Sequence, residues 1–250
     1  MPYARRKTYR KKRTTPARRP RTRTTRRKKR VSRGIRPMVP RTLGFALQPR
    51  RFTKMSWEGS WNITVADSIA SYSNIFRLNS IYDPDFGTVT KNTACNGITL
   101  AGYLYQKYRV HGAKVTVRFS NMTSYNVMGV VTFSNENDFA SSIKPSDMRM
   151  RPGACAKMLG VIGSAGRATV SRYVPINNVL GVTKQEYNGD SANAAYLNAN
   201  PSTACYCGVT VGGMPDNYSS YGAPITVMCS IHITYFVELF DLMSNVGSTS

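Results

Sequence analysis

Hydrophobic and polar residues alternate along much of the chain beyond residue 55, and a period of two predicts half-buried β-strands. In residues 57–65, apolar side chains and one glycine occupy the odd positions and polar side chains the even ones. Residues 127–133 are almost continuously apolar, which predicts a strand buried on both faces. Together these patterns predict strands over residues 57–65, 114–119, 127–133, 167–175, 206–211 and 225–238.

Turn-forming residues separate these segments, and the helical signal is thin. Stretches rich in Gly, Pro, Asn, Asp or Ser lie at residues 83–87, 134–138, 188–200 and 212–217. Only residues 98–108 and 144–150 have a pattern that suits short helices. Seven or eight unevenly spaced strands with long loops predict an all-β fold, built as a sandwich of two antiparallel sheets. A closed barrel would need more even spacing and shorter turns.

Charge divides the chain into two parts. Residues 1–57 carry 22 Lys or Arg and no acid, whereas residues 58–250 carry 13 bases and 12 acids, so nearly all of the net charge of +23 lies at the front. Such a polycation repels itself and buries too little apolar surface to offset its ordering entropy. We therefore expect an Arg/Lys-rich N-terminal arm, residues 1–45, that is disordered when free and orders on an anionic partner, and a folded domain, residues 46–250.

The composition of the arm favours nucleic acid over a membrane or an acidic protein as that partner. Residues 1–30 contain no Leu, Ile, Phe, Trp or Val, so they offer no apolar face for a lipid surface. The basic start is not followed by the apolar segment of a signal peptide, and prolines argue against the amphipathic helix of a mitochondrial transit peptide. No apolar run is long enough to predict a transmembrane helix, so no membrane insertion is expected.

The sequence shows no catalytic or metal-binding constellation, and we expect neither an enzyme nor a cofactor. The five cysteines are an odd number, which excludes a full disulfide framework, and Cys205 and Cys207 are two apart, a spacing that suits core packing on one strand face. His111 and His232 are expected to be ordinary surface or strand residues, His111 at a strand entry. The pairs Asp83 with Asp85 and Glu136 with Asp138 could hold calcium, but turn chemistry explains them more simply.

A basic arm before an all-β body is typical of viral coat proteins, and several segments resemble circovirus capsid proteins. Residues 103–121 resemble that family's early strand, and residues 129–139, 171–182 and 225–242 resemble later segments in the same order. The insertion at residues 111–113 departs from the family pattern. The positions that match the early strand are Tyr108, Arg109, Val110, Lys114, Val115, Val117 and Phe119.

This resemblance, which spans roughly residues 50–242, implies a single eight-stranded jelly roll. It also implies a small T=1 icosahedral shell of sixty copies around a circular single-stranded DNA genome. The virion, and the host nucleus during assembly, would then be the protein's locations. The clusters at residues 5–7, 10–13 and 26–30 also fit a nuclear localisation signal that a host nuclear import receptor reads.

The predicted nucleic-acid-binding residues are the basic side chains of the arm and of its junction with the first strand. Arg and Lys on such an arm pair with phosphates without reading sequence. Tyr3, Tyr9, Phe45 and Phe52 are candidates for stacking on bases, whereas core packing is the favoured role for Trp57. The predicted set is Arg5, Arg6, Lys7, Arg10, Lys11, Lys12, Arg13, Arg18, Arg19, Arg21, Arg23, Arg26, Arg27, Lys28, Lys29, Arg30, Arg50, Arg51 and Lys54.

Two alternatives remain open at this point. A polycationic arm hardly distinguishes DNA from RNA, so the coat protein of a single-stranded RNA virus fits the same pattern. A non-viral nucleic-acid-binding protein with a basic tail is the second alternative, and the near-neutral body counts against it, since such a protein would use its body to bind.

Overall fold

The structure, a computed structural model, describes residues 48–66, 71–87, 89–90, 94–139, 143–163, 165–213 and 224–243. The predictions for residues 1–45 lie outside these residues, as does the one for Phe45. Most described residues belong to strands of two antiparallel sheets, which confirms the predicted all-β sandwich.

The larger sheet is ordered β1-β9-β3-β6, and a short strand β7 also pairs with β3. These strands are β1 (Arg50–Val65), β9 (Ile225–Leu242), β3 (Tyr105–Asn121), β6 (Arg167–Pro175) and β7 (Ala194–Tyr196). The smaller sheet is ordered β2-β8-β4-β5. Its strands are β2 (Ser71–Arg77), β8 (Tyr206–Gly213), β4 (Val127–Ser134) and β5 (Cys155–Leu159).

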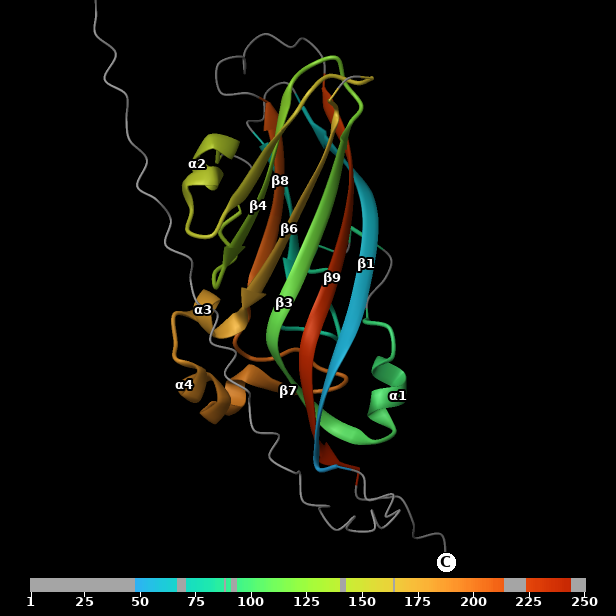
Figure 1. Ribbon diagram of the computed structural model, residues 1–250, viewed down its shortest axis with the longest axis vertical. Coiled ribbons are helices and arrows are strands. Elements are labelled where there is room, and N and C mark those ends of the chain that lie inside the picture. Colours follow the sequence, from blue (N-terminus) through green and yellow to red (C-terminus); the bar gives the residue numbers. More distant parts are fainter. Residues whose placement is uncertain are drawn as a thin grey trace, which may run out of the picture. The chain divides into compact units, whose positions relative to one another are not determined.

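The strand order identifies the sandwich as a jelly roll. With β7 set aside, eight strands are divided four and four, and every pair of hydrogen-bonded neighbours is antiparallel. Strands that are neighbours in a sheet are mostly distant in sequence, as in β1 beside β9 and β2 beside β8, which is the arrangement of two intertwined Greek keys. Figure 1 shows β1, β9, β3 and β6 side by side as one layer.

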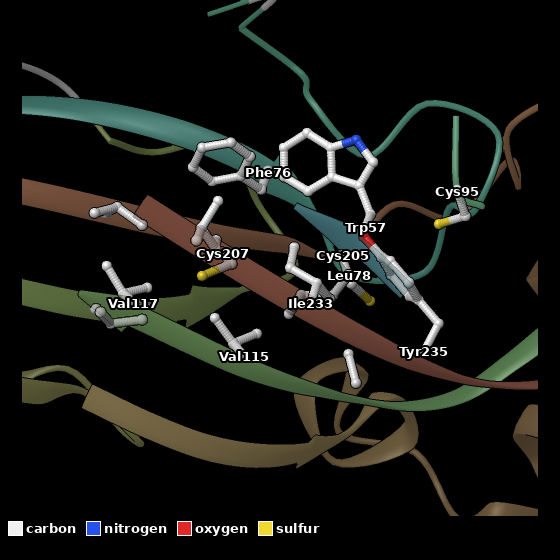
Figure 2. Close-up of a cluster of buried hydrophobic side chains, with 14 of the residues drawn as sticks. Trp57, Phe76, Leu78, Cys95, Val115, Val117, Cys205, Cys207, Ile233 and Tyr235 are labelled. Carbon is white, nitrogen blue, oxygen red and sulfur yellow. The ribbon is translucent and has the colours of Figure 1, made fainter. Parts of the chain in front are cut away.

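The alternation along β1 fills the space between the sheets. Met55, Trp57, Trp61, Ile63 and Val65 are all buried, while the residues between them are exposed or half-buried. The favoured core role of Trp57 is thus confirmed, because only 2% of its surface is exposed. Its ring lies beside that of Phe76 of β2, with 5.6 Å between the ring centroids, and Figure 2 shows both in the cluster that joins the two sheets.

The predicted strands are present, several of them longer than predicted, but the helix expected over residues 98–108 is largely wrong. Helix α1 spans only Ile98–Gly102, and β3 begins at Tyr105. From there the backbone pairs with β9 and β7, and the buried Tyr108 hydroxyl donates to the Ala199 carbonyl oxygen at 3.0 Å. Sheet pairing outcompetes a helix this short, which is marginal on its own. His111 consequently lies within β3, at a bulge, and not at the strand entry.

Several short elements were not predicted, two of them strands of the smaller sheet and the others in the loops of the jelly roll. The strands β2 and β5 were missed, as were α3 (Ile176–Leu180), α4 (Lys184–Gly189), the 3-10 turn η1 (Ser191–Asn193) and β7; the last two lie in the predicted turn region 188–200. The expected helix near residues 144–150 is present as α2 (Pro145–Met150). Helix α4 begins with a capping box in which Thr183 and Glu186 exchange hydrogen bonds, and those bonds lower the pKa of Glu186. No helix of the described chain is long and apolar enough to cross a membrane.

The five cysteines are unpaired, and four are buried, Cys205 and Cys207 among them as predicted. Burial raises the pKa of Cys205 and of Cys229 to about 12, and it also raises the pKa of Cys95 and Cys207, because a thiolate is poorly solvated in the core. The thiolate is the reactive form, so these four thiols should be inert in the folded chain.

We therefore expect iodoacetamide at pH 8 to modify the half-buried Cys155 alone, and the other four only after unfolding in urea. Intact mass against time measures the number of modified thiols. Cys155→Ser should remove the single adduct formed by the folded protein. Equally fast modification of Cys205 or Cys229 would contradict the buried placement.

Candidate nucleic-acid interface

The outward face of the larger sheet, meaning the face turned away from the smaller sheet, is basic. Side chains at alternate positions share a face, so the even residues of β1 and those that pair with them define it. Among the described residues at these positions, the acids are Glu58 and Glu238, and Asp241 of β9 also pairs with Lys107 on this face, at 2.9 Å. Its cations are Arg50, Lys54, Lys107, Arg109, Lys114, Arg118 and Arg167.

The corresponding face of the smaller sheet differs, because the part of it formed by β4 is apolar and lies against α2. Met128 and Val130 of β4 are buried there against Phe139 and against Met148 of α2. Figure 1 shows α2 beside β4 and β8, on the side away from β1. Of the two sheets, only the larger one therefore offers a charged outer face.

The three predicted residues at the start of β1 do not share one face. Arg50 and Lys54 lie on the outward face, each two positions from Phe52, whereas Arg51 points to the other side of the strand. All three side chains are exposed. The other sixteen predicted binding residues, Arg5 to Arg30, lie outside the described residues, so their role stays a prediction.

Cations and aromatic rings alternate across β1, β9 and β3 near this end of the sheet. Arg50 lies opposite Phe240, Phe52 opposite Glu238, and Lys54 opposite Phe236. The Lys54 ammonium lies 5.2 Å from the centroid of the Phe236 ring, a cation–π distance. The guanidinium of Arg109 lies 5.6 Å from the Phe240 ring in the same way.

These side chains surround a hollow of about 660 Å³, which we call the basic-aromatic pocket. Helix α4 completes it, because Lys184 and Asn188 of this helix also line it. Its charged and ring-bearing lining residues are Arg50, Phe52, Lys54, Arg109, His111, Lys184, Phe236, Glu238 and Phe240.

Glu238 is the buried anchor of the pocket, since only 5% of its side chain is exposed. Arg50 Nη1 donates to Glu238 Oε1 at 3.3 Å, His111 Nε2 lies 3.0 Å from Oε2, and Arg109 Nη1 lies 4.0 Å from Oε2. A buried carboxylate needs such partners to offset its desolvation. The carboxylate therefore holds Arg50, Arg109 and His111 in place.

At the rim of the pocket, the side chains of Lys54, Lys184 and Phe52 are exposed to solvent. Lys54 and Lys184 are exposed, and neither has an acidic partner within the part of the chain that is described. Phe52 is 70% exposed, with its ring centroid 5.7 Å from that of His111. Deeper in the pocket, Arg109 Nε is buried and has no hydrogen-bond partner among the described residues. The arrangement is suited to an anion that carries a flat group.

As binding residues, sequence reasoning missed Arg109, His111, Lys184, Phe236, Glu238 and Phe240. The signal available was the even face of the last strand, where Phe236 and Phe240 stand among mostly polar residues. Aromatic residues on a face expected to meet solvent indicate a contact surface. The pairing of that face with Arg50 and Lys54, however, depends on the register of β1 with β9.

Other candidate chemistry receives a structural explanation. Asp83 pairs with Arg77, and Asp85 Oδ2 accepts hydrogen bonds from the backbone and hydroxyl of Thr90. Asp138 pairs with Arg151 at 2.7 Å. His232 is exposed on the outward face, opposite Glu58. Within the described ranges, no three His, Cys, Asp or Glu side chains are grouped so that they could hold a metal ion.

Comparison with known proteins gives structural likenesses alone. No family model matches the chain, and no curated protein matches it. Desmodium yellow mottle tymovirus has a solved chain with 12% identity and a TM-score of 0.37, covering 82% of this chain and 94% of that one. The decameric BFDV capsid protein has 12% identity and a TM-score of 0.41, covering 77% and 99%.

A third solved chain, from the semi-empty virus-like particle of the giant freshwater prawn Macrobrachium rosenbergii nodavirus, has 8% identity and a TM-score of 0.38, covering 79% and 98%. Identities this low assign the chain to no family. The resemblance to circovirus capsid proteins therefore stays a prediction.

Proposed function

We propose that this chain is the coat protein of a small virus, which assembles into a closed icosahedral shell of about sixty copies and packages single-stranded nucleic acid. The observation that carries the proposal is the position of the charge. A jelly roll presents one basic sheet face, and β1 of that face is preceded in the chain by residues 1–49, which hold 19 of the 35 Lys and Arg residues. Residues 1–45 act as the packaging arm and residues 46–250 as the shell domain.

The magnitudes fit this function. Each arm carries 19 Lys or Arg and no acid. Sixty arms would bring about 1,100 positive charges to the interior, enough to neutralise a large share of a genome of about one to two kilobases at one charge per phosphate. The rest of the chain, residues 46–250 with 16 bases and 12 acids, could not do this alone. We propose circular single-stranded DNA as the genome and a second use of the arm in nuclear import, where residues 5–7, 10–13 and 26–30 form the signal.

Expression of the full chain tests the function. We expect the protein to sediment as a large, uniform particle, and nucleic acid inside the particle to survive external nuclease. After the particle is opened, DNase but not RNase should degrade that nucleic acid. Sensitivity to RNase alone would replace the DNA genome by an RNA genome, and a chain that stays monomeric at all concentrations would overturn the proposal.

A further inference from the structure

We propose that the basic-aromatic pocket binds one nucleotide of the packaged strand, with its phosphate on Lys54 and Lys184 and its base against Phe52. This inference rests on the proposed function and adds a specific site on the folded domain. Binding is then divided between an arm that neutralises phosphates and a pocket that receives a base.

The charges around the pocket favour a phosphate. Four cationic side chains line it, and its single carboxylate is Glu238, which is 95% buried beneath its own basic partners. Arg50 uses Nη1 for Glu238 and keeps further guanidinium donors, since arginine has five N–H groups in all. Lys54 and Lys184 have no acidic partner among the described residues, so their ammonium groups are available to phosphate oxygens.

The exposed ring favours a base. Phe52 leaves 70% of its surface exposed, whereas Phe236 already contacts Tyr173, with 5.3 Å between ring centroids, and Lys54. Stacking of a base on an aromatic ring contributes about 1–3 kcal/mol without regard to sequence, because every base has a π-face. The hollow of about 660 Å³ also lies within the range of about 300–1,000 Å³ that is usual for sites of small organic groups.

The position of the pocket in the chain favours nucleic acid over a free anion or an acidic peptide. Arg50, on the pocket, is the first residue of β1, and residues 1–49 that precede it carry 19 Lys or Arg. A nucleic-acid strand that the arm binds is therefore held near the pocket at a high effective concentration. An acidic peptide would use the cations and leave the Phe52 ring without a function.

The test measures the affinity of the full chain for oligo(dT) and oligo(U) at about 1 M NaCl, where the Debye length is about 3 Å and the electrostatic contacts of the arm are screened. Phe52→Ala should weaken this residual binding about 5- to 150-fold, the range that the stacking energy implies. Phe52→Tyr should restore it, because the ring is kept. The matched control is Tyr72→Ala, which removes an exposed ring from β2 of the other sheet and should change nothing.

Inorganic polyphosphate separates the two halves of the site, because it carries charge and no base. At moderate salt, Phe52→Ala should leave its binding unchanged, whereas Lys54→Gln with Lys184→Gln should weaken it. Similar residual affinities for oligo(dT) and oligo(U) would show that the site does not distinguish deoxyribose from ribose. A clear preference for one of them would indicate whether the packaged strand is DNA or RNA.

Unaltered oligonucleotide affinity in Phe52→Ala, or an equal loss for polyphosphate, would overturn the nucleotide site. Particle assembly of the same variants keeps the two proposals distinguishable. If Phe52→Ala binds like the unaltered chain and still forms nucleic-acid-filled particles, only the pocket inference fails. If the unaltered chain forms no particles, the proposed function fails whatever the pocket binds.

Discussion

Deleting residues 1–30 is expected to remove most of the salt dependence of single-strand binding. That segment holds 16 of the 35 Lys and Arg residues and no acid. Each phosphate contact releases condensed counterions, so the slope of log affinity against log salt is about −0.7 per contact for a single strand. Loss of several contacts should lower affinity by orders of magnitude at low salt. The folded domain should keep its structure, because its hydrophobic core is formed by residues between Met55 and Leu239.

The measurement is a titration of a labelled oligonucleotide at several salt concentrations. A control of equal length, in which the basic residues of 18–30 are replaced by Gln, separates charge from chain length and should lose part of the slope. The circular dichroism spectra of the deletion variant and of the Gln control should show the same β-strand signal as the spectrum of the full chain. A slope that stays unchanged after the deletion would place the phosphate contacts on the outward face of the larger sheet instead.

Replacing Phe76 by Ala is expected to lower the free energy of unfolding by about 3–5 kcal/mol. Phe76 is completely buried, and its ring lies 5.0 Å from that of Trp61 and 5.6 Å from that of Trp57, centroid to centroid. It thus joins β2 of one sheet to β1 of the other, and its removal leaves a cavity between two rigid layers that cannot collapse onto it.

Urea unfolding of dissociated subunits, followed by tryptophan fluorescence, measures this loss. The two tryptophans of the chain are the two that flank Phe76, so the signal reports on the site of the change. Phe76→Leu keeps most of the volume and should cost less, about 1 kcal/mol. Tyr72→Ala, which removes a ring that is 44% exposed near the start of the same strand, is the matched control. A loss under about 1 kcal/mol for Phe76→Ala would contradict the packing described.

Strands with one buried and one exposed face could be predicted from the sequence, because their apolar and polar residues alternate. Strands without such alternation could not be predicted. Trp57–Val65 and Ile225–Val237 alternate cleanly because each has one side in the core and one outside. The short β5 (Cys155–Leu159) lies at the edge of its sheet with only Leu159 buried, so its sequence carries no period. The helix predicted over residues 98–108 was wrong because Tyr105 and Tyr108 belong to a strand through pairing with β9 and β7, which are distant in sequence.

The candidate site was predictable only where it depends on local sequence. Arg50, Lys54 and Phe52 follow from the basic junction and the exposed strand start. In the sequence, Glu238 is one polar residue among several on the even face of the last strand. It is buried only because β9 lies between β1 and β3, which flank this residue on both sides. Lys184 reaches the pocket through the position of α4, which no local pattern specifies.

A cryo-electron microscopy reconstruction of particles formed by the full chain tests the central claim most directly. The account predicts a closed icosahedral shell of about sixty jelly rolls, with the basic face of the β1-β9-β3-β6 sheet turned toward nucleic acid in the interior. Uniform monomers, or a shell whose interior faces the covered β2-β8-β4-β5 sheet, would contradict it.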